Sequence, residues 1–570
     1  MMGKVSDLEQ RIELLEALVE SQAKLITEQS EKNSEQSEMI AKLETLVKFY
    51  EEQFALSQRR QFGASSEQTP DQIRFENLFN EPEDQADPSL PEPTYEEINY
   101  KRKKRVGKRA DDLSGLPKVR IDYELPESER ICPECGNVMD DIGVTIRNEL
   151  EIIPAKVQVV EHAVHAYGCE NCEKNNDQAQ IIRADSPEPL ISGSLATPSA
   201  VAYIATQKYV NGIPLYRTEK GFVYDGVVLS RQTMSNWLVH CAQSYLVIIY
   251  SLLITILLKS DICHADETPV QVLHESGRKA QTKSYEWIYR TGKSSEHPIV
   301  IYEYQETRNH EHPEEFLKDF KGYLHTDGYQ AYHDLSSDIV VVGCWSHARR
   351  YWEQLYESIN PADRDGSNAE RGLVYINLLF SLEYEYIGLS PEKRREKRLE
   401  CSKPVSDDYF EWIETLHALP KSLMGKAITY SLLQREYLEN IYLDGRLELS
   451  NNAAERSVKP FVQGRKQWLF SNTPNGAESS SIYYSIIETA KENNLNPFQY
   501  LKFLLEKLPT AKTSEVEALL PWSESLPDYC RVPFKESNKK PIKPMYSSKK
   551  GPLHNALEKL REKYREKDAK

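Results

Sequence analysis

Apolar residues recur in alternating steps of four and three over residues 5–56, and no Gly or Pro interrupts them. This spacing predicts a coiled coil of about seven heptads that joins two copies of the chain. Asn33 at an a position favours a parallel dimer. The alternative is an amphipathic helix that packs on its own chain. The heptad positions are Leu8, Ile12, Leu15, Val19, Gln22, Ile26, Gln29, Asn33, Gln36, Ile40, Leu43, Val47, Tyr50 and Phe54.

The apolar period ends after this repeat, and residues 57–115 are predicted to be a linker. Residues 81–97 carry seven acidic residues and no basic one, whereas residues 101–109 carry seven basic residues in nine positions. Such a local basic run either contacts DNA phosphates or is solvated.

Short runs with alternating apolar positions, such as 118–123 and 156–160, predict strands between residues 116 and 185. Two Cys-x-x-Cys pairs lie in the same segment, and each spacing lets two thiolates bind one ion. The two pairs together predict a Cys₄ structural zinc site in a ribbon-like domain, with four buried free thiols as the alternative. The predicted ligands are Cys132, Cys135, Cys169 and Cys172.

Residues 195–258 have helical patterns. Ser230 is a candidate N-cap for a short amphipathic helix that begins at Arg231, which resembles the second half of a helix-turn-helix. Arg231 would contact DNA in that case, and plain helical packing is the alternative. The apolar run 245–258 is too short to span a bilayer.

Residues 259–350 alternate between apolar, β-rich runs and short helices, which predicts an α/β domain with a mixed sheet. Residues 351–445 are predicted to be a helical insertion, 446–508 to complete the α/β domain with helices, and 509–570 to form a C-terminal region with a basic tail. The predicted class is therefore multidomain α+β. The strands are expected at 261–273, 284–290, 298–304, 322–326 and 338–344, with a helix near 313–320.

The composition refines this picture. A chain of 570 residues exceeds what one core usually supports. Its net charge of −17 argues against a protein that coats nucleic acid nonspecifically, although the segment 531–570 has 13 basic and 5 acidic residues. Nine cysteines, four of them in Cys-x-x-Cys pairs, suit a reducing compartment better than a disulfide framework. No signal-peptide pattern follows the first Met, so a cytoplasmic location is expected.

Three acidic residues carry the candidate chemistry. Asp266 and Asp327 lie at the ends of predicted strands, and Glu455 lies in a helical pattern. If the two strands are neighbours, both Asp side chains converge at their carboxyl ends. Three carboxylates can hold two divalent cations about 4 Å apart, which supports phosphodiester exchange. The alternative for Asp327 is an ordinary Asp-Gly turn, and Asp266 could cap a turn.

Several distinctive motifs occur together along the chain. They are His264-Ala-Asp-Glu-Thr-Pro269, Asp327-Gly-Tyr-Gln-Ala-Tyr332, Cys344-Trp-Ser-His-Ala-Arg-Arg350 and Asn452-Ala-Ala-Glu-Arg-Ser-Val-Lys-Pro460. With these motifs, in this order, residues 5–525 resemble the IS66 family of bacterial insertion-sequence transposases. The Cys-x-x-Cys pairs add to the resemblance, as do the stretches 60–67, 214–217 and 230–233.

The resemblance implies a DDE transposase with an RNase H-like catalytic core that contains a helical insertion. Asp266, Asp327 and Glu455 fall on the family's acidic positions and would bind Mg²⁺ or Mn²⁺. The implied partners are the transposon ends, the target DNA and small accessory proteins of the same element. Lys459 stands where the family often has Arg. Candidate phosphate contacts, with solvated charge as the alternative, are Arg456, Lys459, Arg465 and Lys466.

Other interpretations remain open. A related nuclease or junction resolvase would cut DNA without joining it, and a dimeric zinc-containing regulator would need none of the three acids. A P-loop is disfavoured because Trp287 stands where Thr291-Gly-Lys-Ser294 would need a preceding Gly. Cys344 and His347 have a metal-ligand spacing but no second pair, so structural roles are favoured for them.

Overall fold

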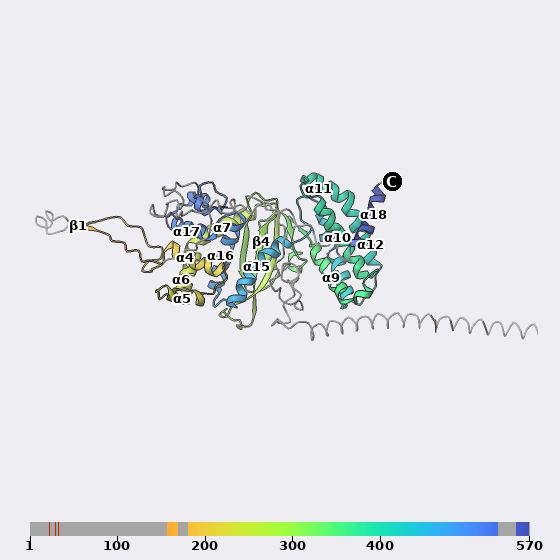
Figure 1. Cartoon of the computed structure of the whole chain (residues 1–570), viewed down its shortest axis with the longest axis horizontal. Coiled ribbons are helices and arrows are strands. Elements are labelled where there is room, and N and C mark those ends of the chain that lie inside the picture. The colour runs from red at the N-terminus through yellow and green to blue at the C-terminus, as the bar shows by residue number, and fades with distance from the viewer. Residues whose placement is uncertain are drawn as a thin grey trace, which may run out of the picture. The chain divides into compact units, whose positions relative to one another are not determined.

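A computed structural model describes residues 157–168, 181–533 and 554–568, together with the isolated helical positions 22, 29, 32 and 33. The predicted linker, the four predicted zinc ligands and nearly all of the predicted coiled coil lie outside the described residues. The described chain belongs to two compact units (Figure 1). One contains residues 251–462 and 554–568, and the other contains 157–168, 181–250 and 463–533.

The first unit is built on a five-stranded mixed sheet with the order β5-β4-β3-β6-β7. β3, β4 and β5 are antiparallel neighbours, while β6 and β7 run parallel to β3. All five predicted strands are confirmed. Their bounds are Ile262–Gln271, Lys283–Thr291, Val300–Gln305, Gly322–His325 and Ile339–Val342, for β3 to β7 in order.

Both faces of this sheet are covered, and β3 and β4 are accordingly buried along nearly their whole length. Helix α15 (Asn452–Trp468) covers the face that carries His264 and Asp266, since the Arg290 guanidinium donates to the Ala453 carbonyl at 3.2 Å. Helix α8 (Glu311–Phe316) covers the opposite face, where Phe316 stacks on Tyr289 at 3.8 Å between ring centroids. The predicted helix near 313–320 is therefore confirmed, although it begins and ends earlier.

A group of helices lies between β7 and α15 in the sequence, as predicted. Buried aromatic residues such as Trp345, Trp352 and Tyr409 form its core. The C-terminal helix α18 (His554–Asp568) packs on α10, and the Tyr564 hydroxyl donates to Asp408 at 2.7 Å. Part of the basic tail is thus anchored to the insertion. The insertion helices are α9 (Trp345–Ser358), α10 (Asn368–Glu385), α11 (Pro391–Lys397), α12 (Lys403–Glu414), α13 (Leu423–Leu433) and α14 (Arg435–Glu439).

The second unit is mainly helical. Tyr209 and Tyr483 stack at 5.0 Å between ring centroids and join α4 to α16. The predicted N-cap is confirmed, because the Ser230 hydroxyl accepts the Thr233 N–H at 3.1 Å. The helices are α4 (Pro198–Tyr209), α5 (Leu215–Tyr224), α6 (Arg231–Cys241), α16 (Pro474–Glu492) and α17 (Pro497–Lys507).

A π-helical turn, Ala242–Leu246, joins α6 to α7 (Val247–Leu257). The resulting helix, Arg231–Leu257, has 27 residues and is long and apolar enough to cross a membrane by length and composition alone. The apolar run 245–258 forms only part of this helix, which extends upstream to Arg231. Length and composition are weak evidence of a span, since core helices pass the same test, and Leu238, Leu246 and Leu253 form part of a fully buried stripe.

The prediction of a strand at 156–160 was wrong. Residues 157–160 have no regular structure, and the short strands of this region are β1 (Ala166–Gly168) and β2 (Ile181–Arg183), which pair antiparallel. Alternation indicates a strand only where one face is buried, and here Val159 is 86% exposed.

Candidate active site

The strands that carry the two predicted aspartates are direct neighbours. β3 and β6 pair in parallel, with His264 opposite His325, and the two imidazole rings stack at 4.3 Å between centroids. Asp266 and Asp327 each follow two residues later, at the same edge of the sheet. The sequence analysis expected the two aspartates to converge if their strands were neighbours, and the strands are neighbours.

A third carboxylate, which the sequence interpretation did not single out, joins this pair. One ligand oxygen each from Asp266, Glu267 and Asp327 lies within 4.8 Å of the others. Arg308 and the Tyr332 hydroxyl donate to Glu267. Burial and the charge of Asp327 nevertheless raise the pKa of Glu267 to about 7. The Asp-Glu pair in the sequence was the available signal, but strand alternation pointed Glu267 to the other face.

Asp327 begins a tight turn and belongs to the carboxylate group at the same time. Its Oδ1 accepts the Tyr329 N–H at 2.9 Å, and Gly328 has a φ of +92°. From α13 of the insertion, the Tyr430 hydroxyl donates to the Asp327 carbonyl at 2.8 Å. The insertion therefore fixes the backbone that presents this carboxylate.

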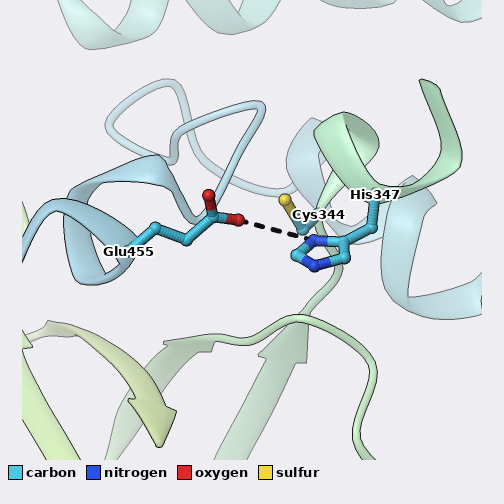
Figure 2. Close-up of side chains that lie close together, drawn as sticks. All are labelled: Cys344, His347 and Glu455. Atoms are coloured by element: carbon cyan, nitrogen blue, oxygen red, sulfur yellow. Dashed lines mark ion pairs between the residues drawn. The ribbon is translucent and has the colours of Figure 1, made fainter. Parts of the chain in front are cut away.

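Glu455 lies in the first turn of α15 and is only 3% exposed. Among the described residues, neither of its carboxylate oxygens has a hydrogen-bond partner. His347 Nδ1 is 3.7 Å and an Arg350 guanidinium nitrogen 3.6 Å from Glu455 Oε1, and Figure 2 shows the imidazole facing this carboxylate. Both separations are too long for good hydrogen bonds.

The other carboxylates act electrostatically on Asp266. Burial raises the pKa of Asp266 well above its usual range, and the charges of Glu267, Asp327 and Glu455 raise it further. Buried carboxylates at this density are costly unless cations compensate them. Carboxylate oxygens are the ligands that hard divalent cations prefer, and the orphaned oxygens of Glu455 leave ligand positions for one. The residues present thus fit a divalent-metal centre.

Asn451 connects the start of α15 to β3. It is fully buried, its Nδ2 donates to the Ala265 carbonyl at 2.7 Å, and its Oδ1 lies 2.9 Å from His264 Nδ1. Its backbone N–H also donates to Cys344 Sγ at 3.1 Å. These contacts hold the start of the helix that carries Glu455 against the strand that carries Asp266.

We expect Asn451→Ala to lower the free energy of unfolding by about 2–3 kcal/mol, because it leaves a buried carbonyl and a buried imidazole nitrogen without their partner. Denaturant unfolding of the purified protein would measure this loss. Asn452→Ala is the matched control and should change stability by less than about 0.5 kcal/mol, since the side-chain oxygen of the partly exposed Asn452 has no hydrogen-bond partner among the described residues. Equal losses in the two variants would contradict the connecting role of Asn451.

A second group of charges lies behind the stacked histidines. Burial and the neighbouring His264 lower the pKa of His325 well below its usual range, so this ring is neutral. Glu448 approaches His264 Nε2 at 3.3 Å and pairs with Lys293. Although burial opposes the effect, His264 and Lys293 lower the pKa of Glu448. Glu448 is therefore charged, its charge is balanced by Lys293, and its contact with His264 fixes the stacked histidine pair next to the carboxylates.

The basic residues predicted to contact DNA do not gather at one place as the carboxylates do. Arg456 is exposed and Lys459 half-buried on α15, where Lys459 lies one turn beyond Glu455. Arg465 is half-buried and Lys466 exposed on the last part of this helix, which belongs to the other unit. Arg231, at the start of α6, is exposed and lies 5.7 Å from the centroid of the Tyr216 ring.

Comparison with known families gives four matches in sequence order. The description "Transposase IS66 family" matches residues 193–479, and "IS66 C-terminal element" matches 485–522. A "zinc-finger binding domain of transposase IS66" matches 129–173, a range that includes all four predicted zinc ligands. The description "Transposase C of IS166 homeodomain" matches 50–121.

Similar curated proteins come from Sinorhizobium fredii (strain NBRC 101917 / NGR234). Uncharacterized protein y4qI is 28% identical over 556 residues, covering 92% of this chain and 99% of that protein. Uncharacterized protein y4jD is 28% identical over 435 residues, covering 73% of this chain and 82% of that protein. The similarity thus extends over nearly the whole chain.

Proposed function

This chain belongs to the IS66 family of transposases, and from this premise we propose that Asp266, Asp327 and Glu455 catalyse metal-dependent DNA cleavage and strand transfer. A transposase has DNA as its partner and works on it in the bacterial cytoplasm. One observation carries the proposal. Asp266 and Asp327 lie at the ends of adjacent parallel strands, and the buried helix residue Glu455, distant from both in sequence, is close enough for its charge and that of Asp327 to raise the pKa of Asp266.

Asp266, Asp327 and Glu455 would hold two Mg²⁺ or Mn²⁺ ions, and Glu267 adds an oxygen beside the first two. Bound divalent cations would activate the attacking water or 3′-hydroxyl and offset charge on the phosphate. The positions of these carboxylates would determine where the cations bind relative to the phosphate. Asn451 and the stacked histidines fix β3 and α15, and the turn after Asp327 is held by Tyr430. Such preorganisation favours an in-line displacement.

The sheet order supports an RNase H-like core as part of this proposal. Three antiparallel strands begin the domain, and two further strands then extend the sheet in parallel to β3. The aspartates come from β3 and from the end of β6. The helices α9 to α14 interrupt the domain before α15 supplies Glu455. The insertion is therefore placed where it can support both Asp327 and Glu455.

Further parts of the proposal concern DNA and assembly. We assign phosphate contacts to Arg456, Lys459, Arg465 and Lys466, and end recognition to Arg231 with the exposed Tyr216 beside it. The family match at 129–173 supports a structural zinc, for which Cys132, Cys135, Cys169 and Cys172 are the proposed ligands. The heptads of residues 5–56 would join two copies, and small accessory proteins of the same element would be further partners.

The test is an in vitro cleavage and strand-transfer assay on DNA that carries the ends of the element. The wild-type protein is expected to give joined product with Mg²⁺ or Mn²⁺ and none with a chelator. Nicking without joining, with all accessory proteins of the element present, would replace the proposal with a nuclease or resolvase. Sequence-specific binding without chemistry under any of these conditions would replace it with a DNA-binding regulator.

A further inference from the structure

A second set of potential metal ligands lies on the far side of Glu455. One ligand atom each from Cys344, His347 and Glu455 lies within 4.8 Å of the others. Figure 2 shows the Cys344 sulfur and the His347 ring together opposite the Glu455 carboxylate. The three residues come from the N-cap and first turn of α9 and from the first turn of α15. Donor atoms around one tetrahedral ion lie about 3.3–3.8 Å apart, and the 3.7 Å between His347 Nδ1 and Glu455 Oε1 matches this spacing.

We propose that Cys344, His347 and Glu455 form a binding site for a transition-metal ion of the Zn²⁺ class. A thiolate, an imidazole and a carboxylate are the donors that Zn²⁺ accepts, whereas Mg²⁺ binds oxygen alone. The group Asp266, Glu267 and Asp327 offers only oxygen. Glu455 would thus lie between an all-oxygen group of ligands and a group that includes sulfur and nitrogen. The inference extends the proposed function at Glu455 but rests on the geometry of the three donors.

Two features of these residues point to an ion rather than to internal packing. Both oxygens of Glu455 and Nδ1 of His347 are buried and, among the described residues, have no hydrogen-bond partner. Such groups normally find partners inside a protein. Cys344 is fully buried, and its sulfur accepts the Asn451 N–H at 3.1 Å. Burial and the charge of Glu455 raise the pKa of the Cys344 thiol to about 12, so a bound metal would have to displace the proton, and the N–H directed at the sulfur would then stabilise the thiolate ligand.

Arg350 competes with the ion for the same groups. One of its nitrogens lies 3.6 Å from Glu455 Oε1, and another lies 3.2 Å from His347 Nε2. A metal bound at Nδ1 requires the imidazole proton on Nε2, where Arg350 now lies, so binding must displace Arg350. Removing Arg350 should therefore tighten the metal site, whereas removing Cys344 or His347 should weaken it.

The experiment is a titration of the full-length protein with Co²⁺ after the zinc finger has been loaded with zinc. The wild type is expected to bind Co²⁺ with thiolate-to-metal charge-transfer absorption. This absorption should disappear in Cys344→Ala, and affinity should fall by about tenfold or more in His347→Ala. Arg350→Ala should bind more tightly than the wild type. Unfolding curves would verify that each variant is folded.

Cys263→Ala is the matched control, because Cys263 is equally buried but lies on the opposite face of β3 and belongs to neither ligand group. The control should keep the absorption, and so should Asp266→Asn. Identical spectra and affinities in the wild type, Cys344→Ala and His347→Ala would overturn the inference. Loss of the absorption in Asp266→Asn but not in Cys344→Ala would overturn it in favour of the carboxylate group. A protein that binds Co²⁺ as expected but fails to join DNA would contradict only the proposed function.

Discussion

Replacing Asp266 with asparagine is expected to lower strand transfer by about three orders of magnitude or more, while DNA binding stays intact. Asparagine keeps the shape of the side chain and removes the charge that holds a cation. Loss of one member of a catalytic group that acts as a unit typically removes most of its rate enhancement. Quantifying joined product on end DNA, with binding measured in parallel by gel shift, would test this expectation.

The same substitution should stabilise the metal-free protein. The folded state raises the pKa of Asp266, so it binds more protons than the unfolded chain, and this carboxyl costs stability as pH rises above the ordinary Asp value of about 4. The asparagine side chain is neutral at every pH and carries no such cost. In a chelator at neutral pH the variant should therefore melt above the wild type, and the difference should shrink as the pH approaches 4.

Asp338→Asn is the control for both readouts, since Asp338 is a half-exposed carboxylate that pairs with Lys321. It should neither abolish joining nor raise the melting temperature. Full joining activity in Asp266→Asn would contradict the proposed catalytic role of this residue. If Asp266→Asn were less stable than the wild type in chelator, repulsion among the carboxylates would not be what destabilises the metal-free protein. Joining activity and melting temperature are independent measurements, so each tests a separate claim.

The strands of the sheet could be predicted because their residues satisfy a local rule. β4, β5 and β7 are rich in β-branched and aromatic residues, and the structure buries both faces of β3 and β4. The two-residue period of a strand placed His264 and Asp266 on one face. The rule misled at residues 157–160, where the apolar side chains are exposed and nothing in the described part of the chain covers them.

The surroundings of Glu455 could not be predicted by such rules. His347 is 108 positions away in the sequence, and its approach depends on how the insertion helix α9 packs against α15. The Cys344-x-x-His347 spacing could bind a metal, but without a second pair structural roles were favoured, and the ligand that we now propose beside them is the helix glutamate. Glu267 was missed for a related reason. Alternation separates it from Asp266 along β3, but both side chains approach Asp327 at the strand end.

Replacing Gly322 with alanine is expected to lower the free energy of unfolding by about 4 kcal/mol and to reduce joining activity. Gly322 begins β6 with a φ of +144°, and a Cβ there would lie 2.3 Å from the Asp261 carbonyl oxygen, just before β3. Neither backbone can yield without separating the two strands. Because β6 presents Asp327 beside Asp266, a shift of β6 would also misplace the carboxylates.

Gly277→Ala separates backbone strain from this steric clash. Gly277 also has a positive φ, +74°, but an added Cβ would meet nothing within 4 Å. This control should cost only about 1–2 kcal/mol, the ordinary penalty for a left-handed backbone conformation, and should leave strand transfer unchanged. Denaturant unfolding and the joining assay on both variants would decide the matter. If Gly322→Ala behaved like Gly277→Ala in both measurements, the close approach of β6 to β3 would not be what aligns Asp266 with Asp327.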